Sequence, residues 1–374
     1  MAFLADRLSA IKPSPTIAVT QKARDLQAQG KDVIGLGAGE PDFDTPPHVI
    51  EAAKKALDAG MTRYTAINGI PELQDAIIAK FKRDHDLDYT RDQIHVSCGG
   101  KPVIFNAMMA TVNPGDEVIV PAPYWVSYAD IPVMFGGVVK VVQCGADNGF
   151  KMTPEQLEEA ITPKTKWLIF NSPSNPTGGA YTEAEIKALA EVLLKHPHVW
   201  IFSDDIYEKL VYDGFKFTTM AQVEPKLYDR TVTMNGMSKA YCMTGWRVGY
   251  CGAPKELVKA MSMVQSQGIT HTAAVSQAAA LGDPRTVGDD VHVVAVNALI
   301  GSANTAYDFI QELAAADPPR IPPDNASSTE VWDKTMEELD AARDAAAVVA
   351  GRYARRAMSK RDTQLDAAID QATD

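Results

Sequence analysis

One lysine of this 374-residue chain lies in a setting suited to covalent chemistry. Lys239 stands in the run 234–250, MNGMSKAYCMTGWRVGY, just after the small residues Gly236 and Ser238. A lysine that attacks an aldehyde must be partly removed from water so that its amine can be neutral. Arg247, further along the run, offers a planar charged fork that suits a phosphate. A lone lysine is usually a solvated surface residue, so the argument depends on the whole run.

A carboxylate and a phenol follow one of the most apolar segments. The run VWIFSDDIYEKLVY predicts a strand that delivers Asp204 at its end, with Tyr207 shortly after it. In an open α/β sheet, ligands bind in the crevice outside the carboxyl ends of the strands. Both residues are therefore candidates for a ligand site at that edge.

Three further segments could hold a flat ring that carries a phosphate. IHVSCGGKPVIFNAMMA predicts a strand, a Gly99-Gly100 turn and a helix, so that backbone N–H groups and Lys101 would face an anion. A simple tight turn is the alternative. Trp125, in PAPYWVSY, could stack on a ring or be an ordinary core aromatic. Asn175 opens the sequence NPTG, which is a turn by default.

In order and content, these segments resemble the class I, pyridoxal-phosphate-dependent aminotransferases of fold type I. The resemblance covers residues 11–281, within the bacterial aspartate aminotransferase branch that includes enzymes acting on prephenate. It implies that Lys239 is the Schiff-base lysine and proton shuttle. It implies that Asp204 pairs with the pyridinium nitrogen of the cofactor and keeps it protonated. Tyr207 and Asn175 would bind the ring hydroxyl, and Trp125 would stack on the ring.

The same resemblance implies a set of phosphate ligands. Gly100, Lys101 and Arg247 would surround the phosphate. Many relatives have serine where this chain has Gly236, so a hydroxyl contact would have to come from Ser238.

Substrate and partner positions are also implied by the resemblance. Gly39, in GLGAGEPDFDTP, would offer its backbone to the carboxylate of the amino acid, beside Trp125 and Asn175. Lys12, in IKPSPTIAVT, stands at the position that matches the prephenate-using branch. Tyr64, in RYTAINGIPEL, would cross a dimer interface and touch the cofactor phosphate of the partner subunit. The resemblance therefore implies a homodimer.

Composition narrows the classes of protein and of partner. A net charge of −12 argues against nucleic acid. The four cysteines are scattered, and no His/Cys cluster has the spacing of metal ligands, so we expect neither disulfides nor a metal site. No apolar run reaches the length of a membrane span, and the first residues do not read as a signal peptide. A cytoplasmic enzyme is the expectation.

Apolar strands alternate with amphipathic helices through residue 281, which predicts an α/β fold. Such strands form a mostly parallel sheet covered by helices on both faces. We expect residues 1–45 to join a small domain and residues 46–281 to form the large, cofactor-binding domain. The strand candidates are VIGLG, IHVSC, EVIVPAP, VVKVV, KWLIF, VWIFSD and TVTMN, and the helix candidates include HVIEAAKKALDAG, PEQLEEAI and EAEIKALAEVLLKH.

Residues 282–374 do not share the resemblance. Relatives carry there an arginine that grips the α-carboxylate of the substrate, and we find no such motif. DPPRIPPDNASS predicts a Pro-rich linker, and the Ala-rich remainder predicts one or two helices. Its arginines at 352, 355, 356 and 361 have no strand context. We therefore expect an atypical or incomplete small α/β domain.

The leading hypothesis is amino-group transfer between aspartate or glutamate and 2-oxo acids such as 2-oxoglutarate or oxaloacetate, with prephenate as a further candidate. One alternative is another fold-type-I reaction, such as that of a C–S lyase or a synthase. A second alternative is a weak or silent cofactor-binding protein whose altered C-terminal region cannot complete the site.

Overall fold

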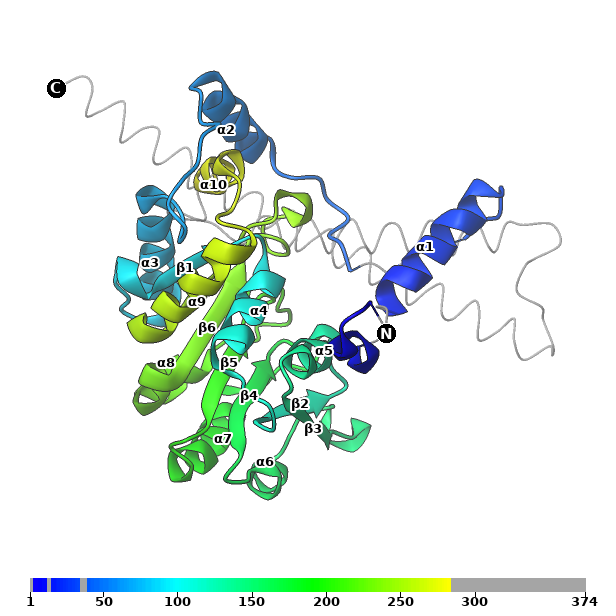
Figure 1. Ribbon diagram of the computed structural model, residues 1–374, viewed down its shortest axis with the longest axis vertical. Helices are drawn as coiled ribbons and strands as arrows, with labels where there is room; N and C mark the ends of the chain where they lie inside the picture. Colours follow the sequence, from blue (N-terminus) through cyan, green and yellow to red (C-terminus); the bar gives the residue numbers. More distant parts are fainter. Residues whose placement is uncertain (1–2, 12–14, 34–38, 284–374) are drawn as a thin grey trace. The chain divides into compact units, whose positions relative to one another are not determined.

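A mixed sheet of seven strands organises the residues that the computed structural model describes, which are 3–11, 15–33 and 39–283 (Figure 1). The strand order is β1-β7-β6-β5-β4-β2-β3. Strand β7 runs antiparallel to both of its neighbours, and the remaining pairs are parallel. The strands are β1 (Ile94–Ser97), β2 (Glu117–Ala122), β3 (Val138–Gln143), β4 (Thr165–Asn171), β5 (Trp200–Asp204), β6 (Thr231–Gly236) and β7 (Gly249–Gly252).

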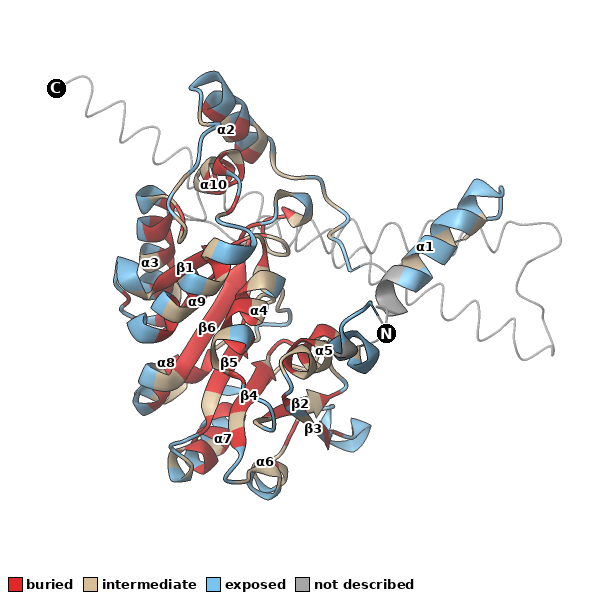
Figure 2. Ribbon diagram, viewed as in Figure 1, coloured by how far each residue is buried: buried red, intermediate tan, exposed pale blue. Residues whose placement is uncertain are grey.

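Helices cover both faces of the sheet, and each face has its own core. Helices α4, α5 and α9 pack with one set of strand residues, including Trp167 and Ile169. Helices α6, α7 and α8 pack with the alternate set, including Leu168 and Phe170. Successive strand residues point to opposite faces, so a strand buried on both faces must be apolar throughout. The inner strands of the sheet are accordingly buried, the edge strand β3 is largely not, and the helices expose their outer sides (Figure 2).

A third apolar cluster lies beside β1 and β7, where α2, α3 and α10 pack together. The α-helices of the described part are α1 (Pro15–Ala28), α2 (Pro47–Asp58), α3 (Pro71–His85), α4 (Gly100–Thr111), α5 (Ser127–Met134), α6 (Pro154–Ala160), α7 (Glu183–Lys195), α8 (Met220–Val223), α9 (Lys255–Gly268) and α10 (Ala274–Leu281). Short 3-10 helices span Asp6–Ala10, Arg91–Gln93, Ala146–Asn148, Pro225–Arg230 and Thr244–Trp246.

Local sequence explains where several helices begin. Helix α6 starts after Thr153, whose hydroxyl accepts the N–H of Gln156 while the Gln156 side chain returns to the Thr153 N–H. Thr182 and Glu185 form the same reciprocal cap at α7. Such boxes satisfy two backbone donors that the first turn leaves unpaired. Helix α3 begins with Pro71 instead. Proline has no backbone N–H, so it leaves no unpaired donor at that position.

Most of the predicted elements are confirmed, and one strand was missed. The six predicted strands from IHVSC to TVTMN match β1 to β6, and the three named helices match α2, α6 and α7. Strand β7 has the sequence GYCG, which is too short and glycine-rich to read as a strand. It forms a strand because it pairs with both β1 and β6, where Tyr250 and Cys251 are buried.

Two predictions fall outside the described residues or at their edge. The strand predicted from VIGLG lies outside the described residues except for Val33. Residues 282–374 also lie outside them, except for the first two. The described residues belong to a compact unit of residues 1–289. The division into 1–45, 46–281 and 282–374 stays a prediction. Among the described helices, none is long and apolar enough to cross a membrane.

Candidate active site

Lys239 lies in the loop after β6, partly removed from solvent. Burial lowers the pKa of its ammonium group, the positive charge of Arg247 lowers it further, and Glu40 acts in the opposite direction. Its Nζ donates a hydrogen bond to the carbonyl of Gly39 and stands 6.0 Å from the ring centroid of Tyr207. An amine in this setting gives up its proton more readily than a solvated lysine.

Asp204 ends β5 with its carboxyl group fully buried. Its Oδ2 accepts a hydrogen bond of 2.6 Å from the hydroxyl of Tyr128, and its Oδ1 accepts one of 3.2 Å from the N–H of Ile206. Burial raises the pKa of Asp204 to about 6, although both hydrogen bonds oppose the shift. A carboxylate held there gains strongly from a positive charge brought to its side.

Tyr207 follows Asp204 and reaches Asn175 across the carboxyl edge of the sheet. The Asn175 Nδ2 lies 3.4 Å from the Tyr207 hydroxyl, and the Asn175 backbone N–H donates to Asn171 Oδ1 at 2.9 Å. Burial, with a smaller contribution from Asp204, raises the pKa of Tyr207 to about 12. The phenol therefore stays protonated at neutral pH and can donate a hydrogen bond to an anionic oxygen.

Two cations converge on the start of helix α4. Gly99 caps the helix with a φ of 95°, and a Cβ there would overlap the guanidinium of Arg247. Arg247 donates to the carbonyls of Thr244 and Cys98 at 2.8 and 3.3 Å. Burial lowers the pKa of Lys101, and nearby Arg247 lowers it further. The two positive charges repel each other at the helix N-terminus, so a bound anion would stabilise this arrangement.

Trp125 and Lys101 form a second contact near this helix start. The Lys101 Nζ lies 4.9 Å from the Trp125 ring centroid, and Trp125 meets Tyr128 edge to face at 5.4 Å. Ser238 is half-buried next to Lys239, and Gly100 is the first residue of α4. Since Tyr128 also contacts Asp204, the aromatic pair connects the helix start with the buried carboxylate.

The segment after residue 38 is tied to the loop that carries the lysine. The Thr45 hydroxyl donates to the carbonyl of Cys242 at 2.7 Å and accepts from the Trp246 indole at 2.9 Å. Thr244 donates to a carboxylate oxygen of Glu40 at 2.9 Å. These contacts, with the Lys239 bond to the Gly39 carbonyl, bring two segments that are distant in sequence to the same place.

Tyr64 does not join this group within the described chain. Its ring meets His271 edge to face at 5.6 Å, and its side chain is 91% exposed. The loop around it is nevertheless anchored, because Gln277 contacts both Thr65 and Ile70. Lys12 lies outside the described residues.

Sequence reasoning missed two supporting residues, Tyr128 and Asn171. Tyr128 donates to Asp204 Oδ2, and Asn171 donates through its side chain to the Asp204 carbonyl at 2.9 Å. The only signal for Tyr128 is its place one helical turn after Trp125, which does not reveal that it faces a carboxylate on another strand. For Asn171, the end of an apolar strand is the available signal.

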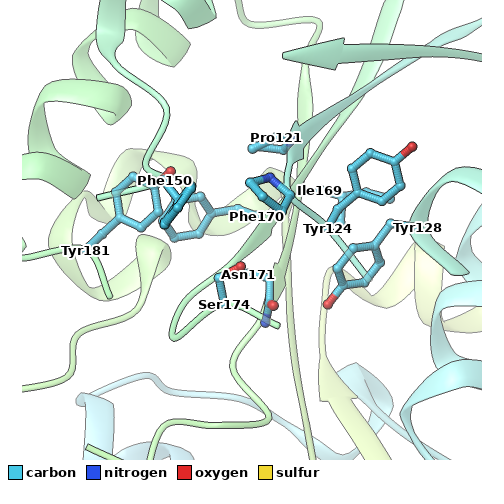
Figure 3. A pocket seen from close by; sticks show the side chains of 10 residues that line it. Pro121, Tyr124, Tyr128, Phe150, Ile169, Phe170, Asn171, Ser174 and Tyr181 are labelled. Atoms are coloured by element: carbon cyan, nitrogen blue, oxygen red, sulfur yellow. The ribbon is translucent and has the colours of Figure 1, made fainter. Parts of the chain in front are cut away.

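A small pocket opens at the carboxyl ends of β2 and β4. Phe150 and Tyr181 line one side and Tyr128 the other, with Asn171 and Ser174 between them (Figure 3). Half of the residues that line the pocket are aromatic, and polar atoms come from the end of β4 and the turn after it. Because Tyr128 also donates to the buried carboxylate, the pocket adjoins the group around Lys239.

The donor set fits a flat, phosphate-bearing pyridine. A buried carboxylate can pair with a protonated ring nitrogen, and a protonated phenol can donate to a ring oxygen. A glycine cradle with two cations at a helix start suits a phosphate. An amine of lowered pKa is available for an aldehyde.

The chain belongs to the family of class I and II aminotransferases, whose family model matches residues 31–326. It is a pyridoxal-phosphate-dependent aminotransferase, and its substrates are amino acids and 2-oxo acids. The family match continues past Leu281, where we expected the resemblance to end.

Relatives and solved structures agree with this family. The chain is 63% identical over 281 residues to the aspartate/prephenate aminotransferase of Cereibacter sphaeroides, covering 75% of this chain and 70% of that one. It is 54% identical over 277 residues to the aspartate aminotransferase of Rhizobium meliloti, covering 74% and 68%. The structure of Thermus thermophilus aspartate aminotransferase with maleate aligns with a TM-score of 0.77 at 43% identity, covering 84% of this chain and 80% of that one.

Proposed function

We propose that this aminotransferase transfers the amino group between aspartate or glutamate and 2-oxo acids, namely 2-oxoglutarate, oxaloacetate and prephenate. The convergence of the Lys239 amine, the buried Asp204 carboxyl and the Arg247 cradle at one sheet edge carries the proposal. The names of the relatives support the choice of aspartate and prephenate.

The described residues divide the binding of pyridoxal phosphate among themselves. Gly100, Lys101 and Arg247 would hold the phosphate at the N-terminus of α4, with Ser238 as a hydroxyl donor. Gly236 itself has little room for a serine, because a Cβ there would lie 3.0 Å from Ile206 and 3.1 Å from a carbonyl oxygen.

Three side chains would orient the ring. Trp125 would stack on it, while Asn175 and Tyr207 would bind its hydroxyl, as their contact with one another suggests. Asp204 would keep a proton on the ring nitrogen, because burial makes an ionised Asp204 costly without a cationic partner. When bound, the cofactor supplies an aldehyde for amino groups and a ring that accepts electron density.

Lys239 would bind the cofactor first and move a proton afterwards. Its amine would hold the cofactor and, when free, would take the proton from the substrate Cα. The pKa lowered by burial keeps a larger fraction of that amine neutral. Gly39, whose carbonyl now accepts from Lys239, would offer its backbone to the substrate. Lys12 is a further substrate contact in the proposal.

The assembly and location are part of the same proposal. A homodimer would give the exposed Tyr64 a role at the cofactor phosphate of the partner subunit, and a cytoplasmic location follows the family. We also propose residues 46–281 as the cofactor-binding domain, with 1–45 and 282–374 contributing the small domain.

The test is a steady-state panel on the purified, cofactor-loaded chain. Aspartate and glutamate serve as donors, and 2-oxoglutarate, oxaloacetate and prephenate serve as acceptors. We expect turnover that needs both a donor and an acceptor, with alanine as a much poorer donor. Continued product release from an amino acid without any 2-oxo acid, beyond the one equivalent per bound cofactor that the first half-reaction gives, would instead indicate a lyase and overturn the proposal.

A further inference from the structure

A buried cluster of charged side chains stands beside the segment that carries Tyr207. Glu208 is 3% exposed, and it bonds Lys80 Nζ at 2.5 Å through one carboxylate oxygen and His85 Nε2 at 2.6 Å through the other. Lys80 and His85 are 1% and 4% exposed and belong to the C-terminal part of α3. A carboxylate so deeply buried is stable only because it is paired.

Further charges complete the cluster at its rim. Asp84 lies 3.6 Å from Lys80, 2.9 Å from Lys209 and 2.8 Å from Arg83. Burial alone would raise the pKa of Glu208, but Lys80 and His85 outweigh it and hold that pKa well below its ordinary range. The carboxylate is therefore ionised at neutral pH.

The cluster is joined to the short turn that contains Tyr207, which is a candidate site residue. The Asp205 N–H donates to the carbonyl of Met234 at 2.9 Å, and the Glu208 N–H donates to the Asp205 carbonyl at 2.9 Å. Tyr207 and Glu208 are neighbours in this turn. Tyr207 reaches Asn175 at the site, while the Glu208 side chain is bonded to α3. A shift of Glu208 must therefore move Tyr207.

Neither a metal nor stability alone explains the cluster. Asp84, His85 and Glu208 have ligand atoms close together, but Lys80 already lies within salt-bridge distance of both carboxylates. Buried ion pairs often stabilise a fold no more than apolar side chains of similar volume. What an ion pair adds is a defined geometry, because its short, directional contacts allow few alternatives.

We propose that Glu208, held by Lys80 and His85, is a positioning residue that fixes Tyr207 for cofactor binding. The inference rests on the proposed role of Tyr207. The proposal predicts that removing the charge of Glu208 weakens cofactor binding only when Tyr207 is present.

A double-mutant cycle on the full chain tests this coupling. Glu208→Gln, Tyr207→Phe and the double variant are titrated with pyridoxal phosphate, and visible absorbance gives the dissociation constant. One hydrogen bond to Tyr207 corresponds to a change of up to about tenfold. We expect each single variant to bind up to about tenfold more weakly, and the double variant to match Tyr207→Phe within about twofold.

The outcomes separate the two proposals. If Tyr207→Phe binds the cofactor normally, the role of Tyr207 in the proposed function fails. If Tyr207→Phe is impaired and the two effects multiply in the double variant, Glu208 acts independently of Tyr207 and the present inference is wrong.

A second variant covers the case in which Glu208→Gln deprives Lys80 of its nearer carboxylate partner and the chain unfolds. Lys80→Met with Glu208→Leu removes both charges at similar volume, so the apo-protein is expected to fold. Its cofactor binding should still be weakened up to about tenfold, and normal binding would overturn the inference. The matched control is Asp75→Asn. Asp75 lies on the same helix as Lys80, and its exposed ion pair is with Arg91 beyond the end of that helix, so breaking this pair should leave binding unchanged.

Discussion

At the residue scale, Asp204 combines a functional position with an unfavourable environment. Its carboxyl group is buried at the end of β5, and burial raises its pKa from 3.8 to about 6. In the cofactor-free chain, the folded state therefore binds this proton more tightly than the unfolded state does. The contribution of protonated Asp204 to the free energy of unfolding is fully present below pH 4 and is lost as the pH rises through 6.

Asp204→Asn should remove this pH dependence from the cofactor-free protein. The free energy of unfolding of the variant, relative to the unmodified chain, should rise by about 2 kcal/mol between pH 4 and pH 7. Denaturant unfolding at several pH values measures the difference, and Asp205, whose pKa burial also raises to about 6, is present in both proteins. A constant difference across this range would contradict the raised pKa. With cofactor, the same variant should lose turnover by orders of magnitude.

Lys239→Ala should abolish covalent attachment of the cofactor and nearly all turnover. The lowered pKa of Lys239, together with its place beside Gly39 and the ring of Tyr207, favours this lysine for covalent chemistry. Borohydride treatment followed by mass spectrometry of peptides measures the attachment. Full-stoichiometry labelling of the variant would show that another lysine carries the cofactor.

The sequence indicated candidate site residues more readily than the residues that contact and support them. Lys239, Asp204 and Asn175 could be named because each stands at the end of an apolar strand or in a distinctive run. Tyr128 and Glu208 could not, because their partners Asp204 and Lys80 are distant in sequence. A contact between side chains on different elements leaves no local pattern in either segment.

At the element scale, the start of α4 depends on glycines at close approaches. Gly249 lies so near Gly99 and Gly100 that a Cβ on it would overlap their backbone. This packing also shows why β7 escaped prediction. Its glycines are required by neighbours in space, whereas in the sequence they read only as a strand breaker.

Gly99→Ala should weaken cofactor binding at least tenfold. The added Cβ would displace Arg247, and alanine is also strained at a φ of 95°. Gly115→Ala is the control, because it has a similar φ of 89° and nothing near its Cβ. Both should lose about 1 kcal/mol of stability, but only Gly99→Ala should lose affinity in a pyridoxal phosphate titration. Equal affinity of the two variants would place the phosphate elsewhere.

At the scale of the whole molecule, Tyr64 is an aromatic residue whose environment is incomplete within the described chain. It is almost fully exposed, although Gln277 and Gln265 hold its loop by bonds to Ile70, Thr65 and Ile67. A fixed loop with an exposed aromatic tip suits a contact with a second subunit.

Tyr64→Ala tests the dimer at this position. Sedimentation should show a dimer for both the variant and the unmodified chain, while the variant binds pyridoxal phosphate up to about tenfold more weakly. Mixing Tyr64→Ala with Lys239→Ala chains should then form hybrid dimers with one intact site and restore part of the activity. Normal cofactor binding by Tyr64→Ala, or no recovery in the mixture, would remove Tyr64 from the site.

The most direct test of the account is the absorption spectrum of the cofactor-loaded chain during stepwise addition of aspartate and then 2-oxoglutarate. The account predicts that aspartate converts the visible band to a near-ultraviolet band, and that 2-oxoglutarate restores the visible band in the absence of aspartate. The amount of oxaloacetate released in the first step should match the amount of cofactor bound. A visible band that does not respond to aspartate, glutamate or any other amino acid would contradict amino-group transfer by this site.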